Sequence, residues 1–143
     1  MKKVFLDTNI VADILLSRMQ WLNDALNILK LVELQMIELY CTSLSFGTLY
    51  YILHRNGFLH EIILEKLKTF RTYCHVLNVD ESDVDSALNS SFKDFEDAMQ
   101  YFSAVSEGCD VIITRNKKDF AESKIQVLEP QEFLDKFCKE MGE

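Results

Sequence analysis

Short apolar runs alternate along the chain with longer stretches in which apolar residues recur at every third or fourth position. The runs predict buried strands because they are brief and rich in β-branched and aromatic residues, and the longer stretches predict amphipathic helices. Pro130 is well placed to open the last helix. We expect five strands, at residues 2–6, 37–41, 75–79, 110–114 and 124–128.

Strands that alternate with helices favour a parallel sheet, because parallel neighbours need a long crossover connection that a helix usually supplies. We therefore predict an α/β fold, a three-layer sandwich whose central, mostly parallel sheet of four to five strands is flanked by helices. No linker or repeat interrupts the pattern, so we expect residues 1–143 to form a single domain.

The composition excludes several classes of protein. Hydrophobic residues make up 48% and charged residues 27% of the chain, as in ordinary globular proteins. No apolar stretch approaches the roughly 20 residues that cross a bilayer, and the run after Lys2 and Lys3 is too short for a signal peptide. We expect a cytoplasmic protein without a membrane segment. The net charge of −8 disfavours broad attraction to nucleic acid phosphates.

Polar residues follow two of the predicted strands. Asp7-Thr8-Asn9 comes directly after the first strand, and the polar run 115–119 follows the strand that ends at Thr114. In parallel α/β sheets, ligands bind beyond the carboxyl ends of the strands. Each group has a simpler interpretation, since Asp7 could cap the following helix and residues 115–119 could form an ordinary turn.

A third polar group opens a predicted helix. Asp94 and Asp97 stand three residues apart and therefore share one helix face, where their charges repel. In water, acidic residues at a helix N-terminus are mildly favourable, so a solvated first turn is one interpretation. In a cleft, a divalent cation would relieve the repulsion, and carboxylate oxygens suit Mg²⁺ or Mn²⁺.

Taken together, these segments resemble the PIN domain, a metal-dependent nuclease fold that includes the VapC-type toxins of toxin–antitoxin pairs. The resemblance runs the length of the chain. It is carried by Asp7-Thr8-Asn9 after the first strand, by Asp97-Ala98 leading to Glu107-Gly108, and by the segment 113–116 with Asp119-Phe120.

The resemblance implies a site and its ligands. Asp7, Asp97 and Asp119 would be catalytic and would bind Mg²⁺ or Mn²⁺, with Asn116 beside them. The basic side chains at the rim of the cleft would hold the backbone of an RNA substrate; these are Arg115, Lys117 and Lys118. For a toxin of this kind, the resemblance also implies a cognate antitoxin and a homodimer.

One family residue is missing. PIN domains usually carry a glutamate early in the helix after the second strand, and Thr48 aligns with that position. Threonine offers a hydroxyl but no negative charge, so the affinity for metal should fall. Asp94, which we include among the predicted metal ligands, or Glu96 could supply the missing charge. Asp13 is a further candidate, with a capping or surface role as the alternative.

Three functions remain open from the sequence. The leading one is a metal-dependent endoribonuclease, the toxin of a toxin–antitoxin pair. The second is a PIN-fold module that binds RNA or protein but cuts weakly or not at all, because Thr48 lacks a carboxylate. The third is an α/β hydrolase or phosphatase with Asp7 as a covalent nucleophile. Asn9, where such enzymes would carry a second Asp, weakens the third.

Overall fold

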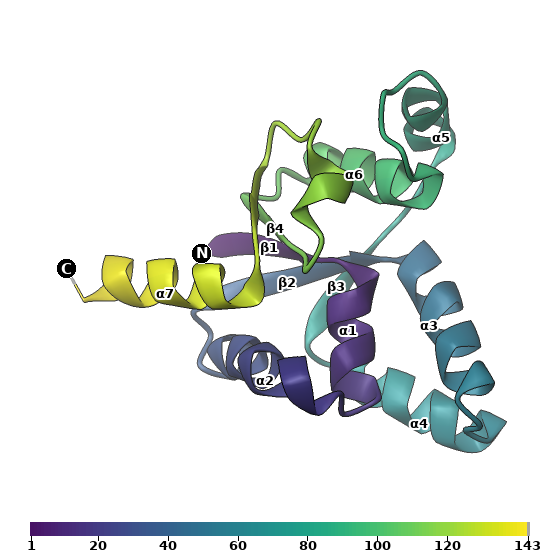
Figure 1. Cartoon of the computed structure of the whole chain (residues 1–143), viewed down its shortest axis with the longest axis vertical. Helices are drawn as coiled ribbons and strands as arrows, with labels where there is room; N and C mark the ends of the chain where they lie inside the picture. The colour runs from purple at the N-terminus through teal and green to yellow at the C-terminus, as the bar shows by residue number, and fades with distance from the viewer. Residues whose placement is uncertain (143) are drawn as a thin grey trace.

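A five-stranded sheet forms the centre of the computed structural model, which describes residues 1–142 (Figure 1). All strand pairs are parallel, in the order β3-β2-β1-β4-β5. The predicted α/β sandwich is confirmed, and the sheet is fully rather than mostly parallel. The strands are β1 (Lys2–Leu6), β2 (Ile37–Thr42), β3 (Cys74–Leu77), β4 (Val111–Ile113) and β5 (Gln126–Leu128).

The helices begin and end at local signals in the sequence. The Thr42 side chain accepts a hydrogen bond from the backbone of Ser45, and Gly108, with φ of 79°, ends the helix before it in the left-handed conformation. Pro130 opens the last helix, as predicted. The helices are α1 (Thr8–Leu15), α2 (Met19–Glu33), α3 (Ser43–Arg55), α4 (His60–Arg71), α5 (Glu81–Leu88), α6 (Phe95–Glu107) and α7 (Pro130–Met141), with a 3₁₀ turn, η1 (Lys117–Phe120).

Alternating side chains of the strands build one hydrophobic core on each face of the sheet. On one face, Val4 and Leu6 pack with residues of α1, α2, α3, α4 and α7. On the other face, Phe5 packs with Tyr101 of α6 and with Phe120 of η1. Figure 1 shows α6 on one side of the sheet and α1 to α4 on the other. The three layers follow from this alternation, because each face must be covered by helices.

The two central strands bring distant segments together. Leu6 of β1 pairs with Ile113 of β4, and the backbone N–H of Asp7 donates to the carbonyl of Ile113 at 3.0 Å. Asp7 and Thr114 therefore leave the sheet side by side. None of the helices between residues 1 and 142 has the length and apolar character that a membrane span requires.

Candidate active site

Asp7 lies at the carboxyl end of β1, with 6% of its surface exposed. The Thr114 hydroxyl donates to its Oδ2 atom at 2.8 Å. Asp7 occupies the N-cap position of α1, but its side chain does not make the side-chain capping hydrogen bond that is usual at this position, so capping alone does not explain its place. Burial raises the pKa of Asp7 to about 6 against the opposing effect of the Thr114 hydrogen bond, and the charge of Asp119 adds to the rise.

Asp97 lies in the first turn of α6 and is half-buried. Burial, together with the charges of Asp7, Asp94, Asp119 and Glu96, raises its pKa to about 8. These carboxylates come from the end of β1, the start of α6 and the η1 turn. The fold therefore brings the three predicted acidic segments to one edge of the sheet, close enough for their charges to act on one another.

Asp94 caps the helix that carries Asp97. Its Oδ1 atom accepts a hydrogen bond from the backbone N–H of Asp97 at 2.9 Å, and its side chain is exposed. The first-turn interpretation made from the sequence thus accounts for the position of Asp94. Its negative charge still reaches Asp97, whose pKa it raises.

Asp119 and Asn116 hold each other in the loop after β4. The Asn116 amide donates to Oδ2 of Asp119 at 2.7 Å. Within residues 1–142, no three Asp, Glu, His or Cys side chains stand close enough together to form a finished metal cage. The donor chemistry nevertheless suits a divalent cation, because carboxylates from three segments repel one another at this edge of the sheet, and a cation would relieve that repulsion.

Thr48 contacts, through Glu96, the group of carboxylates at this edge of the sheet, which we call the acidic edge: Asp7, Asp94, Glu96, Asp97 and Asp119. Its hydroxyl donates to Oε1 of Glu96 at 2.9 Å, and the Gln100 amide donates to the same oxygen at 3.4 Å. Gln100 also joins Thr8 and Ser45 in a closed ring of hydrogen bonds of 3.0 to 3.3 Å. All three side chains of this ring are buried. The ring ties α1, α3 and α6 together beneath the acidic residues, and sequence reasoning did not identify it.

The predicted RNA-binding side chains differ in what they contact. Arg115 donates to both carboxylate oxygens of Asp13, at 2.8 and 3.2 Å. Lys117 pairs with Glu132 of α7 at 3.1 Å in an exposed ion pair, which contributes little to stability. Lys118 is exposed. Asp13 itself is fully buried and accepts hydrogen bonds from two arginines, Arg18 and Arg115. The surface or capping role predicted as the alternative is therefore wrong.

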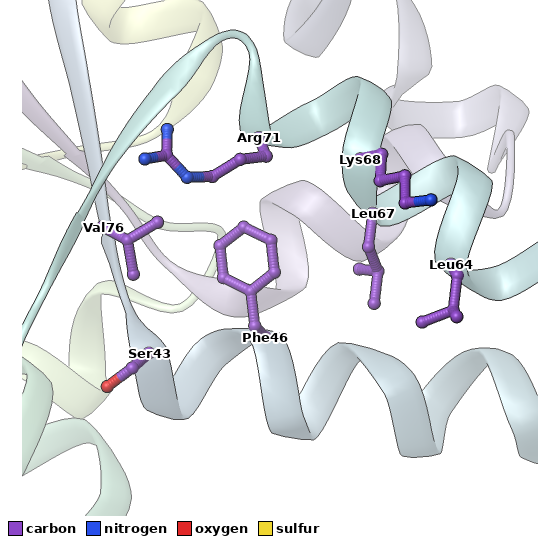
Figure 2. A pocket seen from close by; sticks show the side chains of 7 residues that line it. All are labelled: Ser43, Phe46, Leu64, Leu67, Lys68, Arg71 and Val76. Carbon is purple, nitrogen blue, oxygen red and sulfur yellow. The ribbon is translucent and has the colours of Figure 1, made fainter.

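A pocket of about 440 Å³ lies between α3 and α4, with no acidic residue in its lining. Figure 2 shows the ring of Phe46 reaching from α3 toward α4 and β3, with Leu67 and Val76 beside it and Arg71 above. The lining is mostly apolar and suits a hydrophobic side chain; its charged residues are Lys68 and Arg71, and it contains no carboxylate that could hold a metal ion. The chemistry that the sequence predicts therefore belongs to the acidic edge.

The sheet is fully parallel, and carboxylates from three distant segments lie beyond the ends of its central strands. The chain is therefore an α/β protein with an acidic site at one edge of its sheet. The comparison with known families identifies the family within this class. The family model described as "PIN domain" matches residues 3–118. The chain belongs to the PIN domain family, as the sequence motifs predicted.

Known relatives agree with this assignment. The chain is 28% identical over 147 residues to "Ribonuclease VapC1" of Aquifex aeolicus, a match that covers 95% of this chain and 96% of the relative. The structure superposes on VapBC2 from Rickettsia felis bound to a promoter DNA fragment, with a TM-score of 0.67 and 17% identity over 89% of this chain and 97% of that one. For DNA-bound VapBC from Salmonella typhimurium, the TM-score is 0.64 and the identity 19%, and the match covers 91% of this chain and 99% of that one. At these identities the structural likeness shows the shared fold.

Proposed function

We propose that this protein is a metal-dependent endoribonuclease, the toxin of a toxin–antitoxin pair, which hydrolyses RNA phosphodiesters. One observation carries the proposal: Asp7, Asp97 and Asp119, which are far apart in the sequence, come together at one edge of the sheet, where the charges of Asp7 and Asp119 help to raise the pKa of Asp97. Carboxylates that meet in this way offer oxygen ligands to Mg²⁺ or Mn²⁺. The homologous ribonuclease from Aquifex aeolicus supports RNA as the substrate.

The residues of the acidic edge would divide the work. Asp7, Asp97 and Asp119 would hold the cation, Asn116 would orient Asp119, and Asp94 would add charge from its capping position. A cation held by these residues would supply an activated water and would neutralise charge on the scissile phosphate. Because Asp7 and Asp97 have raised pKa values, they must lose protons when the cation binds.

The direct test combines purified protein with a mixed pool of bacterial RNA. Cleavage is expected with Mn²⁺, and excess EDTA should stop it. If the RNA stays intact while calorimetry detects Mn²⁺ binding, the protein is the non-cutting module that the sequence left open. If millimolar Mn²⁺ neither binds nor supports cleavage, both the nuclease and its metal site are rejected.

We propose that Glu96 supplies the carboxylate that PIN domains usually carry at the position of Thr48. The Thr48 hydroxyl and the Gln100 amide both donate to Glu96, which fixes its carboxylate beside Asp97. Glu96→Gln is expected to weaken Mn²⁺ binding by about tenfold, the size of effect seen when a supporting group of a metal site is lost. Calorimetry on the metal-free protein measures this affinity without reference to cleavage.

A second variant tests whether charge at this place is what matters. Adding Thr48→Glu to Glu96→Gln should restore most of the Mn²⁺ affinity, because the carboxylate returns from the opposite helix. Glu122→Gln, an exposed residue of the loop before β5, is the matched control and should bind Mn²⁺ as the wild type does. Equal affinities for Glu96→Gln and the control would rule out this role for Glu96.

An antitoxin partner belongs to the same proposal. The Rickettsia felis and Salmonella typhimurium neighbours are VapBC assemblies, which supports a partner of the VapB kind. The net charge of −8 suits a partner segment with basic side chains. A homodimer and a cytoplasmic location remain predictions. Co-expression with the product of an adjacent short reading frame, followed by size-exclusion chromatography, measures the complex and its stoichiometry.

A further inference from the structure

Arg115 is held in a fixed orientation next to the acidic edge. Its Nε and Nη2 atoms donate side-on to the two oxygens of Asp13, at 2.8 and 3.2 Å. Its guanidinium carbon lies 3.8 Å from the centroid of the Trp21 ring. Stacking on one face and a bidentate ion pair on one edge leave the planar group very little freedom.

The charges around Asp13 leave one positive charge in surplus. Arg18 donates to Asp13 at 3.1 Å, so two arginines meet a single carboxylate that is 0% exposed. One arginine would neutralise Asp13, and the second keeps its charge for another anion. The chain carries a net charge of −8, which makes a built-in cation at this place notable for an anionic ligand.

The chain turns sharply to build this cluster. Ser17 adopts a φ of 52°, in the left-handed region that residues other than glycine rarely occupy. The backbone N–H of Arg18 then donates to the carbonyl of Asp13 at 2.9 Å. The turn between α1 and α2 thereby returns Arg18 and the start of α2 to Asp13, and Trp21 comes to lie against Arg115.

One edge of the Arg115 guanidinium is not used by the ion pair with Asp13. A guanidinium has five N–H donors, and the side-on pair with Asp13 uses two, which leaves the end-on edge with Nη1. Within residues 1–142, Nη1 makes no hydrogen bond, and the Arg115 side chain is 25% exposed. Arg115 directly follows Thr114, whose hydroxyl donates a hydrogen bond to Asp7. The positive charge of Arg115 lowers the pKa of Asp7. The guanidinium of Arg115 therefore lies near enough to the acidic residues for its charge to act on Asp7.

We propose that Asp13 and Trp21 are positioning residues that hold Arg115 so that its end-on edge binds a phosphate of the RNA backbone next to the cleavage site. This inference rests on the proposed ribonuclease function and adds to it two residues that touch neither RNA nor metal. Because Arg115 is ordered before RNA arrives, binding loses less side-chain entropy than with a mobile lysine.

The sign of one mutational effect separates positioning from plain electrostatics. Asp13→Asn removes a negative charge, so electrostatics alone would make RNA bind more tightly. With Asp13 as a positioning residue, the same change frees Arg115, and RNA should bind about tenfold more weakly. Fluorescence anisotropy of a labelled, randomised 20-nucleotide RNA with Ca²⁺ in place of Mn²⁺ gives the Kd. Asp135→Asn, an exposed residue of α7, removes the same charge elsewhere and should leave the Kd unchanged.

Two Arg115 variants keep the test decisive if Asp13→Asn fails to fold. Arg115→Lys retains the charge but loses the fork, so it should weaken RNA binding nearly as much as Arg115→Gln. Arg115→Gln should also reduce the salt dependence of binding by about 0.7 in the log–log slope, the value of one phosphate contact on a single strand. Trp21 is the sole tryptophan, so its emission should change in both variants before RNA is added.

The outcomes are distinguishable. Weaker binding by Asp13→Asn and Arg115→Lys, with the control unchanged, supports the positioning role. Wild-type affinity in Arg115→Lys, or tighter binding by Asp13→Asn, overturns it while the ribonuclease proposal stands. A wild-type protein that neither binds nor cuts RNA overturns both.

Discussion

Asp97→Asn is expected to abolish Mn²⁺-dependent RNA cleavage and, at the same time, to stabilise the metal-free protein near pH 8. The loss of a supporting residue in a metal site costs roughly 10–100-fold, so the loss of a ligand should cost more than about a hundredfold. The stability gain has a separate cause. The pKa of Asp97 is raised to about 8 from the ordinary 3.8, so the folded protein keeps a proton that the unfolded chain releases.

The sign of the stability effect follows from that proton. Above pH 3.8 the unfolded chain ionises freely, whereas the folded protein pays to ionise Asp97 among other acids. Asparagine carries no charge and removes this cost. Because Asp97 is only half-buried, solvent screening limits the gain to about 1–2 kcal/mol at pH 8. Below pH 4 the two proteins should unfold alike.

Urea unfolding in EDTA at pH 4 and pH 8, together with cleavage assays in Mn²⁺, measures both effects. Asp135→Asn serves as the control, since it removes one exposed carboxylate from α7, which carries none of the proposed metal ligands. A variant that loses cleavage and also loses stability at pH 8 would show that Asp97 acts through the fold rather than through a metal site.

The stability of the metal-free wild type should fall as the pH rises from about 4 to about 8, and Mn²⁺ should reverse the fall. Asp7 and Asp97 have pKa values of about 6 and about 8, both above the ordinary 3.8. A raised carboxyl pKa gives stability that is complete below 3.8 and is lost as the pH passes through the folded value. For nearly buried Asp7 the loss is about 2–3 kcal/mol.

Thermal unfolding across this pH range, in EDTA and in Mn²⁺, tests the prediction. The stabilisation by Mn²⁺ should grow with pH, because the cation competes with protons for the same carboxylates. In the double variant Asp7→Asn, Asp97→Asn, the slope between pH 4 and pH 8 should flatten and Mn²⁺ should have little effect. A slope that persists in the double variant would assign the pH dependence to other groups.

The central strands could be predicted closely from the sequence, and the edge strands less well. β1 matches its predicted range because both its neighbours pair with it. The predicted strand 75–79 is observed as β3, which already ends at Leu77. The carbonyl of the next residue, Asn78, accepts a hydrogen bond from the Ser103 hydroxyl and not from a neighbouring strand. The predicted strand 124–128 begins late as β5, because the N–H groups of Lys124 and Ile125 donate to Tyr101 and Ser123. Tertiary contacts that take these backbone groups leave no pattern in the sequence.

The candidate site divides in the same way. The meeting of Asp7 with the loop after β4 follows from the rule that parallel strands end at one edge, and needs only the strand order. The pairing of Asp13 with Arg115 spans 102 residues, and nothing in the apolar pattern of α1 distinguishes Asp13 from a surface residue. The contact between Thr48 and Glu96 likewise depends on how α3 packs near α6.

The hydrogen-bonded ring of Thr8, Ser45 and Gln100 bears on how such a site can change over evolutionary time. Because the ring fixes three helices to one another, a carboxylate can be exchanged between α3 and α6 while the frame beneath stays rigid. With the role proposed for Glu96, position 48 can lack an acid because position 96 keeps the negative charge at the same place. Selection would then act on the total negative charge that α3 and α6 bring to the site, and not on which of the two helices carries it.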